Sequence, residues 1–307
     1  MRRAILAALL TAGLLAGAGV IYSNRSRSPL YAKLAMSVRY AVGQARGCSA
    51  SSAWKLPETA NHQLTLTGRI RAQSQLVRTL DGMELWRTPH GEFWVPAGTH
   101  PVTLPYLLAM IDRGVYAGVR PGDVVLDAGA HVGVFTRSAL ASGARLVVAI
   151  EPAPGNVRCL RRTFASEIDA GRVIVYPKGL WNRTGTAKLQ VDEYDPALNS
   201  MVLPLQGRIH SIQVDVVTLD QLVRELGLET VSFLKLNIEG AEQQALLGGR
   251  TTLANHRPRI AAVPYHLERD LDEIQRLIRS GSPRYDMRAG ECVRQHGHIR
   301  PEVLWFF

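Results

Sequence analysis

The sequence predicts an α/β protein with a Rossmann-like, mostly parallel sheet of seven strands and helices on both faces. Three observations support this fold class. From residue 123 onward, short apolar segments alternate with segments of helical periodicity. The apolar segments are continuous, which is typical of strands that are buried on both faces. A glycine-containing turn follows the first of them and opens a helix, as in nucleotide-binding folds.

The elements of this sheet follow in chain order. Seven apolar segments have the length of strands, at residues 124–127, 146–150, 173–176, 213–217, 231–236, 260–263 and 303–307. Helices are expected between them at residues 132–142, 156–168, 241–247 and 267–279. A further helix begins at Thr218, which has the spacing of a capping box with Gln221. Residues 184–191 have the pattern of an extra strand outside this series.

A smaller subdomain is expected before the sheet, at residues 61–119. Residues 83–87 and 92–95 alternate between apolar and polar side chains around a turn that contains proline and glycine, which predicts a β-hairpin. Residues 104–117 follow as a helix that leads into the sheet.

The first 23 residues are expected to be a membrane anchor or a signal segment. Residues 4–22 are apolar or small except for Thr11, and as a helix they would span roughly 28 Å, close to the thickness of a bilayer core. The alternative is a cleaved signal peptide with export, because residues 16–18 offer a small-residue cleavage site. We expect the next segment, residues 24–60, to be a basic linker with a short helix at residues 30–42.

Charge and cysteine content exclude several classes of protein. The net charge is +10, but residues 1–55 contain eight basic side chains and no acidic one, so the remaining 28 basic and 26 acidic side chains nearly cancel. A nucleic-acid partner is therefore not expected, whereas a basic tail suits an anionic membrane surface. Three scattered cysteines are too few for a disulfide framework or a zinc cluster, and no metal site is expected.

The loop after the first strand is the most informative stretch. Asp127 ends the strand, and Gly129, Ala130, His131 and Gly133 follow before the helix. A dinucleotide fingerprint requires a glycine where His131 stands, and a carboxylate at the strand end would repel a pyrophosphate. The pattern instead suits a ligand with an amino group and no phosphate, such as S-adenosylmethionine. The alternatives are a helix cap for Asp127 and a tight turn for the glycines.

Glu151 ends the second strand, one βαβ step after Asp127. An acid at this place can accept hydrogen bonds from both hydroxyls of a ribose. NAD and S-adenosylmethionine both carry a ribose, so Glu151 predicts a nucleoside-type cofactor without choosing between them. An oxidoreductase that uses a nicotinamide cofactor therefore stays among the candidate functions.

Several ordered segments resemble the FkbM-type family of methyltransferases. They are DAGAHVG at residues 127–133, AIEP at 149–152, VTLD at 217–220 and FLKLNIEGAE at 233–242, with weaker similarity at 265–271 and 303–306. The resemblance implies a class I methyltransferase domain at residues 120–307, S-adenosylmethionine as cofactor, and O-methylation of a small-molecule or glycan hydroxyl. Two positions depart from the family pattern, because His131 stands where the family has Asn and Asn237 where it has Asp.

Candidate catalytic residues lie in the second half of the chain. An acceptor hydroxyl must lose its proton near the transition state, and Glu239, His266 and the acids at residues 192–195 could receive it. Asn237 follows the strand next to the reacting centre, and Asn199 and Ser200 resemble the acceptor side of the family.

Each catalytic candidate also has an ordinary structural interpretation. Asn237 could cap a helix, Glu239 could interact with a helix dipole, and His266 could be a locally hydrogen-bonded polar side chain. The alternative function is a membrane-tethered, catalytically weakened binding or scaffold protein, which Asn237, His131 and the expected membrane anchor favour. Because the cofactor is made in the cytosol, we expect the catalytic domain to face the cytosol. The sequence does not assign an oligomeric state.

Overall fold

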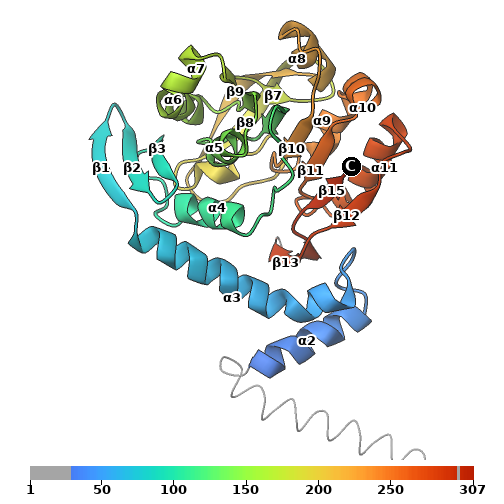
Figure 1. The fold of residues 1–307 in the computed structure, drawn as a ribbon. Coiled ribbons are helices and arrows are strands. Elements are labelled where there is room, and N and C mark those ends of the chain that lie inside the picture. The colour runs from blue at the N-terminus through green and yellow to red at the C-terminus, as the bar shows by residue number, and fades with distance from the viewer. Residues whose placement is uncertain (1–28, 296–297) are drawn as a thin grey trace, which may run out of the picture.

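The computed structural model describes residues 29–295 and 298–307, and it contains the predicted seven-stranded, mostly parallel sheet. Its strands, in spatial order, are β12 (Met287–Ala289), β15 (Leu304–Phe306), β11 (Arg259–Ala262), β10 (Phe233–Leu236), β4 (Val124–Ala128), β5 (Leu146–Ile150) and β6 (Val173–Tyr176). The pairs from β11 to β6 are all parallel, and β15 is antiparallel to both of its neighbours (Figure 1).

One predicted strand of the sheet lies elsewhere. The segment expected at residues 213–217 belongs to β9 (Ile209–Val217), which forms a side sheet with β7 (Gly179–Leu180) and β8 (Gly185–Asp192). Strand β9 pairs antiparallel with β8 and parallel with β7, and its amino-terminal half is largely exposed while only its end is buried. The seventh place in the main sheet is taken by β12, which is too short and too polar to be found from sequence.

Helices pack on both faces of the main sheet because alternate strand residues point to opposite sides. Leu126, Leu234 and Ile260 pack on one face in the cluster that α8 (Leu219–Glu225), α9 (Glu242–Leu247), α10 (Arg250–His256) and α11 (Asp270–Gly281) complete. Val125 and Phe233 pack on the other face with α4 (Thr103–Asp112) and α5 (Val134–Ala141). Two further helices, α6 (Pro154–Thr163) and α7 (Ala165–Asp169), flank β6.

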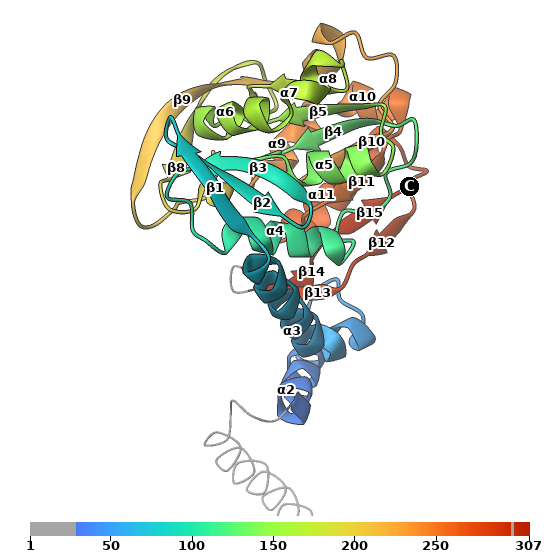
Figure 2. The ribbon, with the colours of Figure 1, turned by 60° about the vertical axis from the view of Figure 1, so that its left-hand side comes forward.

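A second, three-stranded sheet lies beside α6. It consists of β1 (Gln75–Leu80), β2 (Met83–Thr88) and β3 (Gly91–Pro96), paired antiparallel in this order (Figure 2). Strands β2 and β3 occupy the region of the expected hairpin, and β1 joins them as an outer strand that is exposed along its whole length. The backbone N–H of Trp94 in β3 donates to Thr163 Oγ1 at 3.0 Å, which links this sheet to α6.

The stretch that was expected to be a linker is largely helical. Helix α2 (Pro29–Ala41) corresponds to the short helix expected there, but α3 (Ala50–Ala72) is a 23-residue helix that spans the boundary expected at residues 60 and 61. Its buried stripe includes Thr59, Gln63 and Thr67 beside apolar residues, so a hydrophobic periodicity does not reveal it. Helix α3 packs on α4 and carries α2 away from the domain (Figure 1).

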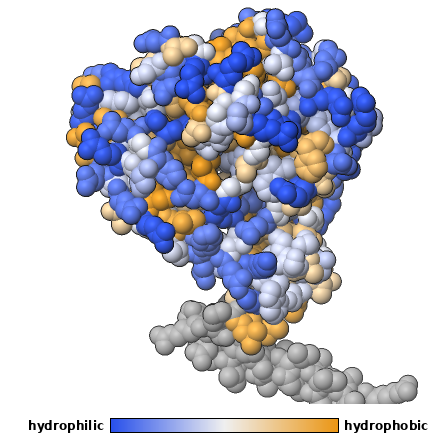
Figure 3. All heavy atoms as spheres, viewed as in Figure 1, coloured by the Kyte–Doolittle hydropathy of each residue, from blue (hydrophilic) through white to orange (hydrophobic). Residues whose placement is uncertain are grey.

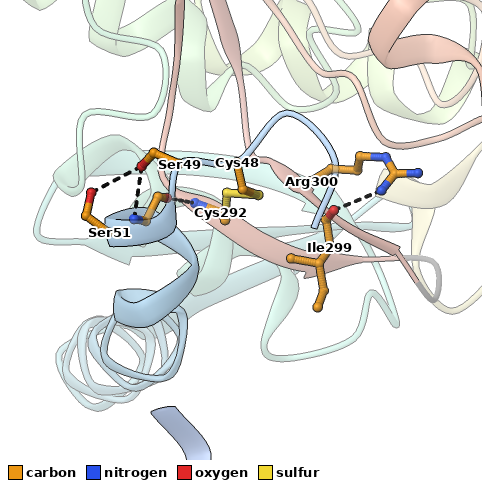
Figure 4. Close-up of a disulfide and its surroundings, with 7 residues drawn as sticks. Cys48, Ser49, Ser51, Cys292, Ile299 and Arg300 are labelled. Atoms are coloured by element: carbon orange, nitrogen blue, oxygen red, sulfur yellow. Dashed lines mark hydrogen bonds between the residues drawn. A yellow bond between two sulfur atoms is a disulfide. The ribbon is translucent and has the colours of Figure 1, made fainter. Parts of the chain in front are cut away.

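A disulfide joins the helical arm to the end of the chain. Cys48, between α2 and α3, is bonded to Cys292 at the start of β13 (Cys292–Gln295), which pairs with β14 (His298–Pro301) (Figure 4). The backbone N–H of Cys292 also donates to Ser52 Oγ at 2.7 Å. The sequence analysis expected no disulfide framework, and composition could not identify this pair, which is separated by 244 residues.

The membrane localisation expected from the sequence needs correction. In residues 29–295 and 298–307, no helix combines the length and the hydropathy that crossing a bilayer requires. The apolar segment at residues 4–22, on which that expectation rested, lies outside the described residues. The face drawn in Figure 3 is mostly hydrophilic, with hydrophobic residues gathered near its middle and at its foot.

Candidate active site

The loop after β4 is held from inside the protein by Asp127. Its side chain is fully buried, and Oδ2 accepts a hydrogen bond from Thr136 Oγ1 at 2.7 Å while Oδ1 lies 3.1 Å from Lys235 Nζ. Asp127 therefore does not cap helix α5, whose first turn follows Gly133 without a side-chain cap. It also does not line the adjoining cavity. Its carboxylate positions the loop from inside the protein. Direct binding of the cofactor by Asp127, which the sequence analysis expected, stays a prediction.

Two glycines allow the loop to pack closely. Gly129 has φ +78°, and a Cβ atom there would lie 1.9 Å from the carbonyl oxygen of Asn237. Gly133 has φ +91°, and a Cβ atom there would lie 2.1 Å from the ring of Phe164. Gly129 and Ala130 line the cavity, whereas Gly133 serves the packing of α5.

His131 reaches the cavity with an imidazole that the protein leaves unsatisfied. Its backbone is left-handed at φ +52°, its side chain is buried, and neither ring nitrogen has a hydrogen-bond partner among the described residues. Burial, with a smaller contribution from the charge of Lys235, lowers its pKa to about 3. The ring is therefore neutral, with one donor and one acceptor for a bound molecule.

Glu151 lies at the end of β5, beside His131. Its Oε2 accepts the backbone N–H of His131 at 2.9 Å, and its Oε1 accepts that of Ala153 at 2.9 Å. Burial raises the pKa of Glu151 to about 7, although these hydrogen bonds act in the opposite direction. Oε1 also accepts a longer hydrogen bond from Asn156 Nδ2 at 3.4 Å, whereas Oε2 keeps a further lone pair for a ligand hydroxyl.

Lys235 is a site residue to which the sequence analysis gave no role. Its Nζ lies 2.7 Å from the carbonyl oxygen of Gly129 and 3.1 Å from that of Ala128, in addition to the contact with Asp127. Lys235 and Asp127 are direct neighbours in the pairing of β10 with β4. A lysine inside an otherwise apolar buried strand was the available signal, because such a charge requires a buried partner.

The three candidate catalytic residues lie close together at the end of β10. His266 Nδ1 is 3.0 Å from Glu242 Oε1, and His266 Nε2 is 3.4 Å from Glu239 Oε1. Burial alone would lower the pKa of His266, but the two carboxylates raise it well above its usual value. Asn237 Oδ1 is buried and has no hydrogen-bond partner within the part of the chain that the structure describes.

Glu242 fixes the turn that carries Glu239. Its Oε1 accepts the backbone N–H of Ile238 at 2.8 Å and its Oε2 that of Gly240 at 3.0 Å, on either side of Glu239, which has φ +51°. Ser200 Oγ donates to the carbonyl oxygen of Glu239 at 2.7 Å. The sequence analysis assigned Ser200 to the acceptor side by resemblance. In the structure its hydroxyl stabilises the turn that carries Glu239.

The Glu242–His266 pair also approaches Asp270. Ligand-type atoms of these three residues lie within 4.8 Å of one another, an arrangement that could hold a metal ion. The oxygens of Asp270 accept hydrogen bonds from Gln243 Nε2 at 2.9 Å and from the backbone N–H of Leu267 at 2.6 Å. Because these carboxylates are already engaged by hydrogen-bond donors, the cluster is organised as an ion-pair network.

The acids at residues 192–195 divide between two roles. Asp192 Oδ1 accepts the backbone N–H groups of Tyr194 and Asp195 and so shapes the loop, and Asn199 Oδ1 accepts the N–H of Asp192 at 2.9 Å. Asp195, just before the short helix η1 (Pro196–Leu198), accepts from Thr103 Oγ1 at 2.9 Å and faces a cavity. Burial raises the pKa of Asp195 despite these hydrogen bonds.

Two cavities meet at Asn237 and Glu239. The first is lined by Gly129, His131, Glu151 and Lys235 among others. The second is lined by side chains of α4, the 195–198 segment, Tyr265 and His266. Asn237 and Glu239 line both. The apolar residues Leu107, Met110 and Ala197 also line both, so the two cavities adjoin along a shared wall whose polar side chains are Asn237 and Glu239.

Comparison with known proteins shows the family. The model of the methyltransferase FkbM domain matches residues 127–302. The 31-O-demethyl-FK506 methyltransferase FkbM of Streptomyces tacrolimicus is 26% identical over 188 residues, which cover 52% of this chain and 72% of that protein.

A solved structure has the same fold. The crystal structure of methyltransferase FkbM from Methylobacillus flagellatus KT matches with a TM-score of 0.50 at 18% identity. The match covers 91% of this chain, which spans only 58% of that one. Since the family model covers more than half of the chain and includes both the loop after β4 and the Glu239 turn, the protein belongs to the FkbM methyltransferase family.

Proposed function

We propose that the protein transfers a methyl group from S-adenosylmethionine to a hydroxyl oxygen of a small molecule or glycan. The observation that carries the proposal is the junction of two cavities at Asn237 and Glu239. One cavity has the side chains that a nucleoside-type methyl donor requires, and the other has room for an acceptor. The FkbM family membership supports methyl transfer, and the hydroxyl acceptor is our proposal.

The residues of the first cavity fit this cofactor. Glu151 would accept the ribose hydroxyls, and the unpartnered imidazole of His131 supplies a neutral donor and acceptor beside it. Lys235 is fully engaged by Asp127 and two carbonyl groups, so it leaves no free cation to attract a phosphate. When bound, S-adenosylmethionine supplies an electrophilic methyl group on a sulfonium centre.

At the junction of the two cavities, we propose that Glu239 is the base that takes the proton of the acceptor hydroxyl. As the acceptor oxygen bonds to the methyl carbon and the carbon–sulfur bond breaks, the carboxylate of Glu239 takes the hydroxyl proton. His266 lies 3.4 Å from this carboxylate and holds it in place. Asn237 Oδ1 offers a buried acceptor for the hydroxyl or for an amino group of the donor. Most of the rate then comes from holding both reactants in line.

Asn237 is also the observation that favours a second candidate, a protein that binds the cofactor without transferring its methyl group. The family pattern has a carboxylate here, and the amide cannot act as a base. In this candidate the cofactor loop is intact while the reaction at the junction is lost. The two candidates make the same prediction for binding and opposite ones for turnover.

The test combines binding and turnover on the full chain. We expect calorimetric titration to show binding of S-adenosylmethionine and none of NAD, with Glu151→Gln weakening it and the exposed Glu229→Gln leaving it unchanged. Turnover is followed as S-adenosylhomocysteine formed with a panel of hydroxylated acceptors. Glu239→Gln should lower kcat by about 10²–10⁴-fold without weakening cofactor binding.

Three results would count against the proposal. Preferential binding of NAD would favour an oxidoreductase. Binding without turnover, with turnover gained in Asn237→Asp, would favour the second candidate. A Glu239→Gln variant that retains full kcat would remove Glu239 from the proton transfer.

A further inference from the structure

The charges around the acceptor cavity carry an inference about its substrate, which rests on the function proposed above. We infer that this second cavity admits polyhydroxylated acceptors without a negative charge and excludes acceptors that carry carboxylate, phosphate or sulfate. The proposal stands on which side chains line the cavity, how each is paired, and where the nearest cations are held.

Both acidic side chains of the lining face the acceptor space. Asp195 is on the loop before η1, and Glu239 is at the junction with the donor cavity. Among the described residues that line this cavity, none is a lysine or an arginine. An anionic group placed here would lose its hydration and meet two carboxylates without a counter-charge.

His266 does not provide that counter-charge. Its ring lies between Glu242 and Glu239, at 3.0 and 3.4 Å from their nearest oxygens, and its side chain is almost fully buried. One imidazolium between two carboxylates leaves a group with a net negative charge. The cluster therefore adds to the repulsion of an anion.

Two buried cations outside the lining, Arg113 and Lys235, are already paired. Arg113, which follows α4 directly, forms an ion pair with Glu302 at 2.5 Å, and Glu291 lies at 3.4 Å. Lys235, in the donor cavity, is held by Asp127 and two carbonyl groups. Freeing either cation to meet an anionic acceptor would leave a buried carboxylate without its partner.

The remaining lining suits hydroxyl groups on a compact ring. Tyr106 Oη accepts a hydrogen bond from Gln295 Nε2 at 3.2 Å, which fixes a phenol at the wall. Thr103 and His100 add polar atoms, and Tyr106 and Tyr265 add aromatic surface. A sugar-like molecule presents hydroxyl groups to carboxylates and apolar ring faces to aromatic side chains, which matches this distribution.

The experiment compares matched glycosides on the full chain. The methyl glycosides of glucose, galactose and mannose are each paired with the corresponding uronide, in which a carboxylate replaces the hydroxymethyl group. Acceptor binding is measured by saturation-transfer NMR without the methyl donor. We expect the neutral members to bind at millimolar concentration and the uronides to bind at least about 100-fold more weakly.

Variants test the assignment of the charge. Asp195→Lys should reduce the ratio of the two dissociation constants within each glycoside–uronide pair by about tenfold, whereas Asp169→Lys, at an exposed position, should leave this ratio unchanged. If Asp195→Lys does not fold, Asp195→Asn replaces it. This variant should reduce the ratio of the two dissociation constants by less than tenfold. Equal or tighter binding of the uronides, or no binding of any neutral glycoside at millimolar concentration, would overturn the inference.

This design separates the inference from the proposed function. Failure of S-adenosylmethionine to bind would reject the proposed methyl transfer while leaving the charge preference of the cavity measurable. Conversely, a normal titration of the donor together with binding of uronides would reject the inference alone.

Discussion

The Nζ of Lys235 lies 3.1 Å from Asp127 Oδ1, and the two residues are direct neighbours across the parallel pair β10–β4. Both side chains are buried inside the sheet, at 4% and 0% exposure. The same ammonium group donates to the carbonyl oxygens of Ala128 and Gly129, which begin the cofactor loop. One buried pair thus ties the loop of one strand to the neighbouring strand that carries Asn237.

Removing the lysine from this pair should destabilise the whole domain. Lys235→Met leaves Asp127 as an unpaired buried charge, and we expect a loss of about 3–5 kcal/mol in the free energy of unfolding. The measurement is urea denaturation of the full chain. The double variant Lys235→Met with Asp127→Asn should lose less, since no charge then remains buried. Equal losses in the single and double variants would argue that packing, and not charge pairing, makes Lys235 important.

The affinity for S-adenosylmethionine should rise with pH in the range where Glu151 ionises. Its pKa is raised to about 7 by burial, and only the carboxylate can accept hydrogen bonds from both ribose hydroxyls. We expect the Kd to fall by about tenfold between pH 6 and pH 8, as the ionised fraction increases. Calorimetry in two buffers should show proton release on binding. Glu151→Gln should bind more weakly at all pH values and lose this dependence.

The raised pKa of Glu151 makes the stability of the ligand-free protein fall with pH, whereas the affinity for the cofactor rises. The pKa of Glu151 in the folded protein lies above the ordinary value of 4.5, so its protonated form favours the folded state. This contribution is fully present below about pH 4.5 and is lost as the pH rises through 7, by about 3 kcal/mol in all. In the Glu151→Gln variant the fall in stability between these pH values should be smaller, as thermal unfolding without ligand would show.

Gly129 should be far less tolerant of alanine than a glycine with a similar backbone and open surroundings. A Cβ atom at Gly129 would lie 1.9 Å from the carbonyl oxygen of Asn237, whereas one at Gly171 meets nothing within 4 Å. Both residues have positive φ, so Gly171→Ala measures the conformational cost alone, about 1 kcal/mol. In chemical denaturation, the loss in free energy of unfolding caused by Gly129→Ala should be larger than that of Gly171→Ala by at least about 2 kcal/mol. Similar losses in the two variants would show that the loop can move away.

Breaking the disulfide should loosen the helical arm while the sheet stays folded. Replacing both Cys48 and Cys292 by serine should lower the free energy of unfolding by about 2–4 kcal/mol. Limited proteolysis should then cut first between α2 and α3. A reductant should lower the free energy of unfolding of the parent protein and increase its proteolysis, whereas neither quantity should change in the double variant. A parent protein that resists both treatments equally would indicate that packing around Ile299 and Ala53 holds the arm without the crosslink.

Much of the fold could be predicted because its strands are buried on both faces. The segments around Val125, Val148 and Leu234 are apolar throughout, and they lie where the sequence placed them. Helix α3 could not be found this way because Thr59 and Gln63 occupy its buried stripe and use hydrogen bonds in place of apolar contacts. Edge strands such as β12 have only three residues and show no pattern.

The candidate site was predictable where one residue serves one local purpose. Glu151 and His131 lie in the cavity, as the loop pattern suggested. Asp127 was placed correctly at the strand end, but its partners Lys235 and Thr136 come from a neighbouring strand and a following helix, so its inward orientation could not be foreseen. The link from Glu242 through His266 to Glu239 likewise depends on the tertiary fold, since it joins the ends of β10 and β11.

The disulfide between Cys48 and Cys292 determines how far the amino-terminal end of the chain can be shortened before the folded unit loses a connection. A truncation that begins in α3 beyond Ser52 would delete Cys48 and Ser52 together, and so remove the sulfur and the hydroxyl that hold Cys292. It would also delete Ala45, which bridges to Ile299 on β14. Strand β13, which carries Gln295 into the wall of the acceptor cavity, would then lose its outer attachment. Fragments intended for crystallisation or assay should therefore start ahead of Ala45.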